Sequence, residues 1–539
     1  MNRYLKIGLL VVLVAAAVGV YGPGLGYPIF FDDRNFFERG GMYRLVLDGF
    51  SLSPRWLPYF TMTWTDLVFD NGVLAQRGVS LVIHLLTAFV LYSLVKQISN
   101  HVVPHRNNER AAFAAALLFV LHPLAVYAVG YLIQRTILLA TLFGLLSLSA
   151  YFDGLVTRKK SYFVLSALFY LLSVLSKEHA ILIPAAALAL TPLAGPLTTR
   201  TWRQMLLPVS LYAAIAILVA INYQGIVGEA YEPLAAPLVK QHLPTQSPAL
   251  IWGLSVLTQA ALFFKYLGLM LIPYPGWMSI DMRVPFATSL VEPKYVLGAL
   301  ALLVYGLGAL FWLLRGGRRG LVGFALLAPL LLFAVEFSAV RIQEPFVLYR
   351  SYLWLAPLFL LLPVVSSGLP DKVFWPLLLL IGFAFAYASS DRLHTFSDSF
   401  ALWDDAVKKL PDERALGSAR AHSSRGYGNA TRGELQASLG DFERALRVDP
   451  KYGDAYQNRA WVYAKLGDYT AALRDANTLI QLYPDELKAY TLRGRIYRDM
   501  GDFDRAIADY TYACERKWMG ACLALTLTRQ QQAAERAAE

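Results

Sequence analysis

Residues 5–37, LKIGLLVVLVAAAVGVYGPGLGYPIFFDDRNFF, run from an apolar segment directly into two adjacent carboxylates, Asp32 and Asp33. An apolar segment of this length after a basic N-terminus is typical of a first membrane span. A cleaved signal peptide is the alternative, but residues 21–23 lead straight to the acidic pair, which favours an uncleaved span. A carboxylate beside lipid is disfavoured unless it faces water, a cation or a substrate, so the pair predicts a functional site. The simpler alternative is a solvated turn.

The composition of the whole chain indicates a membrane protein. Of its 539 residues, 56% are hydrophobic and only 16% are charged, and the mean hydropathy is +0.44. These values are too apolar for an ordinary soluble protein. Apolar runs of about 20 residues, the length that crosses a bilayer, recur up to Ser390 and then stop. We therefore predict a multi-pass membrane domain over residues 1–390 and a soluble helical domain over residues 391–539.

The basic residues predict the topology rather than a nucleic-acid partner. The net charge is +11, but Lys and Arg lie in short clusters between apolar runs instead of along one face. We predict eleven spans, at about 5–22, 76–97, 111–127, 135–153, 161–176, 180–196, 204–222, 294–314, 320–339, 346–364 and 373–390. The apolar segment 250–273 is predicted to be interfacial or re-entrant, because a full crossing would put the basic cluster 315–319 on the wrong side. The N-terminus is then cytoplasmic and the soluble domain periplasmic.

This topology collects the unusual polar side chains on the outer face. An enzyme that moves a sugar from a membrane-embedded polyprenyl phosphate to a hydroxyl needs a carboxylate to accept the proton and cations to hold the leaving phosphate. Asp32 and Asp33 are the predicted catalytic bases. The predicted ligands of the donor phosphate are Arg135, Lys177, His179, Arg341 and Arg350, and the further candidates on this face are His122, Gln134, Glu178, Glu344 and Tyr349.

Simpler interpretations exist for several of these residues. His122 precedes Pro123, so it can cap a helix end. Lys177 and Glu178 can pair with each other across a turn. Arg135 and Arg350 lie at the edges of apolar runs, where an unpaired guanidinium is costly unless it extends to the interface.

Residues 421–520 repeat with a period of 34. At this spacing Gly433 aligns with Gly467 and Gly501, Asp441 aligns with Asp475 and Asp509, and Pro450 aligns with Pro484. The pattern resembles tetratricopeptide repeats, in which pairs of antiparallel helices stack into a solenoid. We predict a half-repeat at 396–411, repeats at about 419–452, 453–486 and 487–520, and a cap at 521–535. Such solenoids offer a concave surface to a protein partner; the alternative is an appendage that only stiffens the assembly.

The chain has two cysteines, Cys514 and Cys522, both near the predicted cap. In an oxidising compartment a local disulfide is expected, and two buried thiols are the alternative. The sequence shows no metal-ligand spacing and no Gly-rich phosphate loop, so it lends no support to a divalent metal or another cofactor.

The order of these segments resembles the GT-C type membrane O-glycosyltransferases that carry C-terminal tetratricopeptide repeats, such as the eukaryotic transmembrane and tetratricopeptide-repeat O-mannosyltransferases and their bacterial relatives. The matching segments are 31–33, 121–135, 175–179, 266–281 and 344–353. The resemblance implies an all-α protein, with a GT-C-like membrane bundle followed by a soluble α-solenoid. It also implies a polyprenyl-linked sugar as donor and a catalytic acidic residue in the first external loop, at Asp32 or Asp33. Residues 344–350 depart from the mannosyltransferase pattern, so the donor sugar is left open.

The predicted function is that of an inner-membrane glycosyltransferase. It would move a sugar from a polyprenyl-(pyro)phosphate to a Ser or Thr hydroxyl of an envelope protein docked on the repeats. Some bacterial relatives glycosylate type IV pilins, so the resemblance implies a pilin-like acceptor. Two alternatives remain: a ligase or polymerase of lipid-linked glycans, and a non-enzymatic membrane anchor that presents the repeats as an assembly platform.

Overall fold

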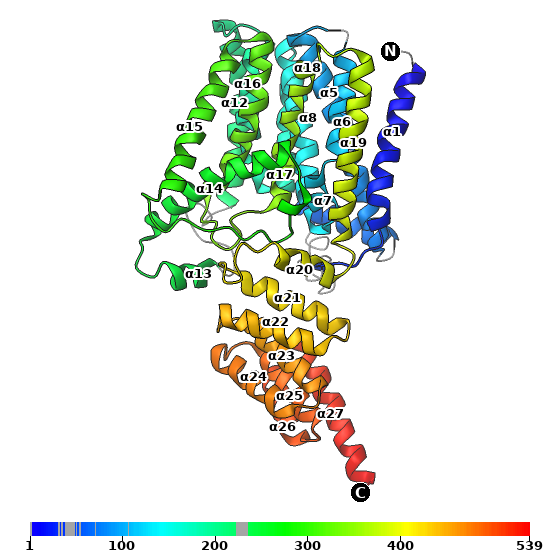
Figure 1. The fold of residues 1–539 in the computed structure, drawn as a ribbon, viewed down its shortest axis with the longest axis vertical. Coiled ribbons are helices and arrows are strands. Elements are labelled where there is room, and N and C mark those ends of the chain that lie inside the picture. Colours follow the sequence, from blue (N-terminus) through cyan, green and yellow to red (C-terminus); the bar gives the residue numbers. More distant parts are fainter. Residues whose placement is uncertain are drawn as a thin grey trace. The chain divides into compact units, whose positions relative to one another are not determined.

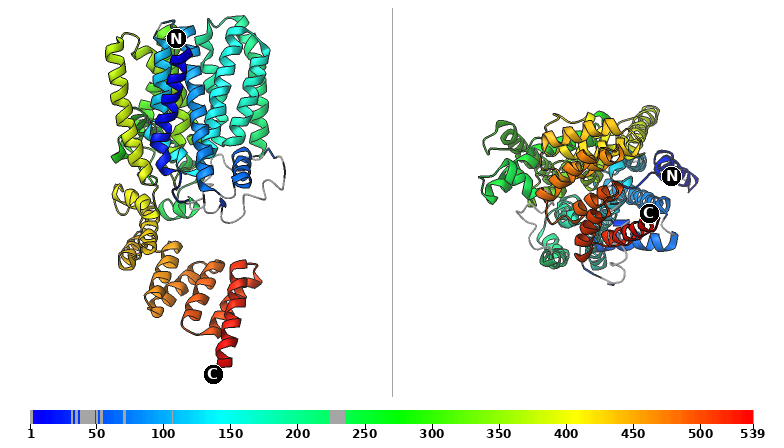
Figure 2. Two further views of the ribbon diagram at one scale, coloured as in Figure 1. Left: turned by 90° about the vertical axis from the view of Figure 1, so that its right-hand side faces the viewer. Right: turned by 90° about the horizontal axis from the view of Figure 1, so that it is seen from below.

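The computed structural model describes residues 3–538 except 31–32, 34–35, 38–48, 50, 53–54, 70–71, 106 and 223–234. The predicted base Asp32 therefore lies outside the described residues. The chain divides into two compact units, residues 1–282 with 286–397, and residues 283–285 with 398–539 (Figures 1 and 2). The described part of the chain contains no strand, and one bridge joins Met282 to Phe346. The all-α prediction is confirmed.

The first unit is a bundle of helices with short 3-10 turns between several of them (Figure 1). Its α-helices are α1 (Arg3–Tyr21), α4 (Trp56–Phe69), α5 (Val73–Val102), α6 (Asn108–Val120), α7 (Pro123–Val129), α8 (Arg135–Thr157), α9 (Lys160–Ser176), α10 (Ile183–Ala189), α11 (Thr191–Ala194), α12 (Thr199–Asn222), α13 (Ala235–His242), α14 (Pro248–Leu271), α15 (Pro293–Leu314), α16 (Gly317–Phe333), α17 (Ser351–Leu358), α18 (Leu362–Val365) and α19 (Asp371–His394). Its 3-10 turns are η1 (Gly22–Gly24), η2 (Leu132–Gln134), η3 (Glu178–Leu182), η4 (Pro275–Trp277), η5 (Ala334–Ser338), η6 (Leu348–Arg350) and η7 (Phe359–Leu361).

Long apolar helices of this unit fit a multi-pass membrane protein. Within the described ranges, eight helical segments are long and apolar enough to cross a membrane. Several present their apolar side chains outward: on α15, for example, Leu303, Val304 and Leu307 are all exposed. Soluble proteins rarely expose apolar patches this continuous, whereas lipid covers them at no cost.

Seven of these eight segments correspond to predicted spans, and the eighth is α14 (Pro248–Leu271). Of the four other predicted spans, those at 5–22 and 161–176 form shorter apolar helices over the described residues, whereas those at 111–127 and 180–196 are broken by a bend or by turns. The segment predicted at 111–127 bends by 57° between α6 and α7, where His122 is extended and Pro123 starts α7. The segment predicted at 180–196 is divided among η3, α10 and α11. In addition, α4 forms inside the predicted external loop 23–75, where no helix was expected.

The helix α14 corresponds to the segment predicted to be interfacial. By length and composition it also qualifies as a span. However, it runs alongside the connection between α16 and α17: Trp252 Nε1 donates to the Phe337 carbonyl at 2.8 Å, and Gln259 Nε2 donates to the Pro345 carbonyl at 2.7 Å. These contacts do not distinguish a spanning helix from an interfacial one, so the interfacial placement stays a prediction.

The second unit is a stack of helix pairs. Its helices are α20 (Ser399–Lys408), α21 (Ser418–Thr431), α22 (Leu435–Val448), α23 (Gly453–Lys465), α24 (Tyr469–Leu482), α25 (Leu487–Asp499), α26 (Phe503–Glu515) and α27 (Met519–Ala538). Each 34-residue repeat thus holds one pair of antiparallel helices, with α20 before the first pair and α27 after the last. Small residues at equivalent positions, such as Ala472 and Ala506, are fully buried where the helices pack.

The repeated glycines end the first helix of each pair. Gly433, Gly467 and Gly501 have φ values of +86°, +81° and +81°, a left-handed conformation that glycine adopts without steric cost. At each of them the next amide bonds back across the helix end, as where Asp468 N donates to the Tyr463 carbonyl at 3.0 Å. This is the Schellman motif, and it satisfies carbonyls that a helix end leaves without partners.

The repeated aspartates join the two helices of each pair. Asp475 accepts two hydrogen bonds from Arg459, from Nε at 2.7 Å and Nη2 at 2.8 Å. The same two-point contact occurs between Arg425 and Asp441 and between Arg493 and Asp509. We call these three contacts the Arg–Asp ladder.

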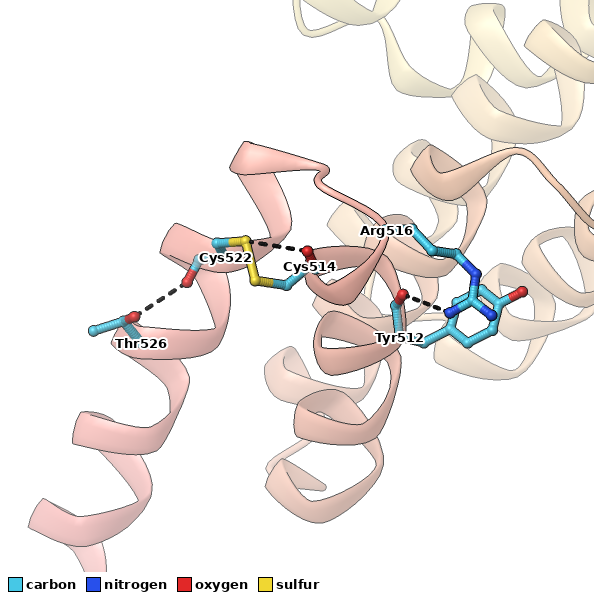
Figure 3. Close-up of a disulfide and its surroundings, with 5 residues drawn as sticks. All are labelled: Tyr512, Cys514, Arg516, Cys522 and Thr526. Carbon is cyan, nitrogen blue, oxygen red and sulfur yellow. Dashed lines mark hydrogen bonds between the residues drawn. A yellow bond between two sulfur atoms is a disulfide. The ribbon is translucent and has the colours of Figure 1, made fainter.

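A disulfide joins the last pair to the cap. Cys514 of α26 is bonded to Cys522 of α27 (Figure 3). The predicted disulfide, rather than two free thiols, is therefore present, and it closes a short loop that contains Trp518.

Candidate functional site

The predicted outer connections of the first unit meet at one end of the bundle. Gly24, just after α1, lies against the Leu393 side chain at the end of α19. The Phe30 ring packs edge-on against Phe396, with ring centroids 6.5 Å apart, and Tyr127 of α7 packs against the same ring. The C-terminal ends of α1 and α19 are thus neighbours, so the two helices run in the same direction through the bundle (Figure 1).

Glu336 is the centre of a buried ionic cluster at this end. It lies in η5, directly after α16, and its side chain is only 1% exposed. One carboxylate oxygen lies 2.9 Å from Arg350 Nη1 and 3.1 Å from Arg341 Nε. The other lies 3.1 Å from His179 Nε2. Three of the predicted phosphate ligands therefore surround one carboxylate.

A second carboxylate, Glu178, extends the cluster. Arg55 donates to both of its oxygens, from Nη2 at 2.6 Å and Nε at 3.1 Å. His179 Nδ1 lies 3.4 Å from Glu178, so this imidazole stands between Glu178 and Glu336. Glu178 pairs with Arg55 instead of with its neighbour Lys177, which answers the question left open by the sequence.

Lys177 completes the cluster from the α8 side. Its ammonium donates to Gln134 Oε1 at 2.8 Å and to Thr136 Oγ1 at 3.3 Å, and it lies 4.8 Å from the centre of the Tyr349 ring. It is also within electrostatic range of Arg350. We define the Glu336 cluster as Arg55, Lys177, Glu178, His179, Glu336, Arg341 and Arg350. Among the described residues the cluster thus holds four cations and two carboxylates besides His179.

The Asp33 side chain lies against the start of η2, and the residue is 1% exposed. Its two oxygens accept the backbone N–H groups of Ile133 at 2.8 Å and Leu132 at 3.2 Å. Hydrogen bonds to the charged form of a carboxylate make it a weaker base. Asp33 is thus placed to anchor the first external loop on the bundle.

Arg135 does not join the Glu336 cluster. Its side chain is fully buried, and its guanidinium donates to Gln76 O and Oε1 at 2.7 Å, to Thr65 Oγ1 at 3.2 Å and to Ser80 Oγ at 3.3 Å. These acceptors belong to α4 and α5, so the side chain ties both helices to the start of α8. The contacts are those of a packing residue.

The other candidates divide between the cluster and the scaffold. His122 caps α7, since its Nδ1 accepts the Leu124 N–H at 3.2 Å while Nε2 lies 3.1 Å from the Met270 carbonyl. Gln134 and Tyr349 contact Lys177. Glu344 is half-buried on the segment between α16 and α17. Over the ranges that the structure describes, no group of three or more His, Cys, Asp or Glu side chains is arranged to hold a metal ion.

Sequence reasoning missed Glu336 and Arg55. For Glu336 a signal existed: it is a lone carboxylate within the apolar run LLLFAVEFSAV, where an ionisable side chain is a functional-site candidate by default. Arg55 lies directly before α4, and nothing in its local sequence pattern distinguishes it.

Comparison with known proteins identifies the repeats. Two family profiles described as tetratricopeptide repeat match residues 441–474 and 458–521. The prediction of tetratricopeptide repeats is therefore confirmed over residues 441–521, and repeats of this class suggest protein–protein interaction in general. No curated protein matches the chain.

A solved structure also resembles the repeat region. It is the crystal structure of a thermophilic tetratricopeptide-repeat protein from Thermus thermophilus, 20% identical, which is covered over 90% of its own length and 32% of this chain with a TM-score of 0.22. At that TM-score the family profiles, not this structure, identify the repeats.

Proposed function

We propose that this protein is a membrane glycosyltransferase of the GT-C type. It moves a sugar from a polyprenyl-phosphate or polyprenyl-pyrophosphate donor to a Ser or Thr hydroxyl of an envelope protein, on the periplasmic face of a bacterial inner membrane. The observation that carries the proposal is the Glu336 cluster, in which the buried side chains of Lys177, Arg341 and Arg350 gather near one buried carboxylate at one end of an apolar bundle.

A group of buried cations at one end of the bundle favours an anionic ligand. Hydrogen bonds between a guanidinium and a phosphate are charge-assisted, and an arginine is suited to bind phosphate oxygens at two points. The Glu336 carboxylate would hold Arg341 and Arg350 in place for that contact.

The apolar exterior favours a lipid-linked donor. A polyprenyl chain needs an apolar medium, and exposed apolar side chains on α12, α15 and α19 provide a lipid-facing surface. A headgroup at the end of the bundle and a chain in the bilayer would suit such a donor.

The reaction would be a displacement at the anomeric carbon. The acceptor hydroxyl oxygen attacks that carbon, the bond from the carbon to the phosphate oxygen breaks, and the hydroxyl proton passes to a carboxylate. Asp32 is the base that we assign, because the oxygens of Asp33 already accept two backbone N–H groups. A single displacement inverts the anomeric configuration.

The repeats favour a protein acceptor over a glycan acceptor. A ligase or polymerase of lipid-linked glycans could use the same cationic cluster but has no need of a protein-binding solenoid. An assembly platform would use the repeats but leaves the buried cations without a purpose.

The test is transfer by the purified full-length protein. A synthetic polyprenyl-phosphate or -pyrophosphate sugar is supplied with a Ser/Thr acceptor peptide, and the product mass and anomer are read by mass spectrometry and NMR. Asp32→Asn should abolish transfer while donor binding persists. Transfer that survives in both Asp32→Asn and Asp33→Asn, or a retained anomeric configuration, would overturn this mechanism.

A further inference from the structure

The second unit contains a groove on the first helices of its pairs. Its volume is about 580 Å³, within the range of binding pockets. It is lined by residues of α21, α23, α25 and α26. Trp518, just before α27, and Gly520 and Ala524 of α27 line one side. All of these elements belong to one compact unit.

One row of the groove lies at equivalent positions of successive repeats. Tyr427, Trp461 and Arg495 are spaced by 34 residues and all line the groove. The first two repeats thus present aromatic rings, and the third presents a guanidinium. This differs from the Arg–Asp ladder, where every repeat has the same two residues.

The charge of the groove is of one sign. Its lining includes Lys488, Arg495 and Arg498 and no Asp or Glu. Arg498 shares its charge with Asp499 at 2.9 Å, and Lys488 is 3.8 Å from Glu486, at the limit of an ion pair. Arg495 is exposed, and within the described part of the chain no hydrogen bond or ion pair engages it.

Aromatic rings flank these cations. Lys488 lies 6.0 Å from the centre of the Trp518 ring, and Trp461 lies on the neighbouring repeat of the same groove. Ring faces of this kind pack against apolar side chains, while cations, above all Arg495, attract carboxylates. A groove that offers both suits a peptide that carries both.

We propose that this groove binds an acidic, extended segment of a partner protein, with carboxylates at Arg495 and Lys488 and an apolar or aromatic side chain between Trp461 and Trp518. Under the proposed function that partner is the acceptor, and only this last assignment rests on the proposed function. Charge complementarity favours this occupant: three cations and no acid line the surface.

The test measures binding without any sugar donor, so it stands whether or not transfer occurs. Full-length protein in detergent is titrated into a short fluorescent peptide of Glu, Ser and one Tyr, and anisotropy is recorded. A matched peptide with Gln in place of Glu reports the contribution of charge. We expect the acidic peptide to bind, the Gln peptide to bind at least about tenfold more weakly, and high salt to weaken binding of the acidic peptide.

Charge reversal locates the contact. Arg495→Glu should weaken binding of the acidic peptide about tenfold or more, because it replaces an attraction by a repulsion. Arg529→Glu is the matched control, because this substitution changes the net charge by the same amount. Arg529 is exposed on α27 and does not line the groove. This variant should bind as the parent does. Thermal unfolding of both variants verifies that the fold is intact.

Several results would overturn the proposal. They are equal binding of the acidic and Gln peptides, equal loss in the Arg495 and Arg529 variants, and preferential binding of a neutral oligosaccharide. Anionic lipid vesicles form a further arm: if Arg495→Glu abolishes vesicle binding while the acidic peptide never binds, the groove faces a membrane surface and the proposal fails.

Discussion

The two units use the same charged side chains in opposite ways. In the Arg–Asp ladder an arginine meets an aspartate at the same positions of three repeats, and in the first repeat Arg425 also contacts Asp404 while Asp441 also accepts from Arg444. In the Glu336 cluster one carboxylate meets two arginines and a histidine, and the arrangement occurs once. The ladder lies where the helices of a pair meet, so it holds a fold. The cluster gathers cations from several connections around one buried carboxylate, which is the arrangement that the proposed donor phosphate would use.

The largest effect should come from removing the centre of the cluster. Glu336→Gln keeps the size of the side chain but leaves the surrounding guanidinium groups without their counter-charge, a change that costs about 3–5 kcal/mol in buried ion pairs. We expect a clear fall in thermal stability and loss of transfer. Differential scanning calorimetry and the transfer assay measure the two effects. Phosphate in the buffer should restore part of the stability by replacing the missing anion, and a variant as stable as the parent would mean that the cluster is already balanced.

Arg350 distinguishes a catalytic cation from a structural one. Arg350→Ala should lower turnover on the order of a hundredfold or more, because a cation that meets charge developing on the leaving group acts mainly in the transition state. Glu336 then keeps Arg341 and His179 as partners, so the fold should persist. Steady-state kinetics with purified donor measures the loss. Near-normal turnover would assign Arg350 to the scaffold.

A substitution in the Arg–Asp ladder should lower stability without lowering turnover, the reverse of what is expected for Arg350. Asp475→Asn removes the charge that receives both bonds of Arg459. Stability should fall by about 1–3 kcal/mol, the usual worth of a hydrogen bond to a charged group, while the turnover of folded protein stays unchanged. Denaturant unfolding and the transfer assay together check this. A loss of turnover without a loss of stability would erase the distinction between the two networks.

The smallest effect is a pH dependence at the start of the second unit. Burial acts to raise the pKa of Asp398, but its hydrogen bond from Ala401 N–H and its contact with Arg432 outweigh this, so the pKa lies below the ordinary value. A depressed pKa adds stability that is present above the unfolded-state value and is lost as the pH falls through the folded-state value. Unfolding curves between neutral and acid pH should therefore show a smaller loss in Asp398→Asn than in the parent.

The structure of the second unit could be predicted from local sequence patterns alone. The glycines at 433, 467 and 501 mark helix ends because only a left-handed residue closes the Schellman motif there, and the 34-residue period fixes the packing of the pairs. In a repeat array each residue contacts only its own and the neighbouring repeats, so the sequence pattern predicts the packing.

The first unit depends on contacts between distant segments, which a single sequence does not display. Arg55 meets Glu178 across 123 positions of the chain. Arg135 was predicted beside the phosphate ligands, but its hydrogen bonds turn it toward α4 and α5. The outer-face residues that do converge, such as Lys177 and His179, were found because topology alone assigned them to one side.

The disulfide between α26 and α27 makes the shape of the groove depend on whether the two cysteines have been oxidised. Trp518, one wall of that groove, lies inside the loop that Cys514 and Cys522 close. A newly made chain in a reducing compartment would carry this wall on an open loop, and only oxidation after export would lock it. Under the proposed periplasmic location, this wall of the groove would thus be fixed only after export, so a chain without the disulfide would be slow to bind the proposed partner.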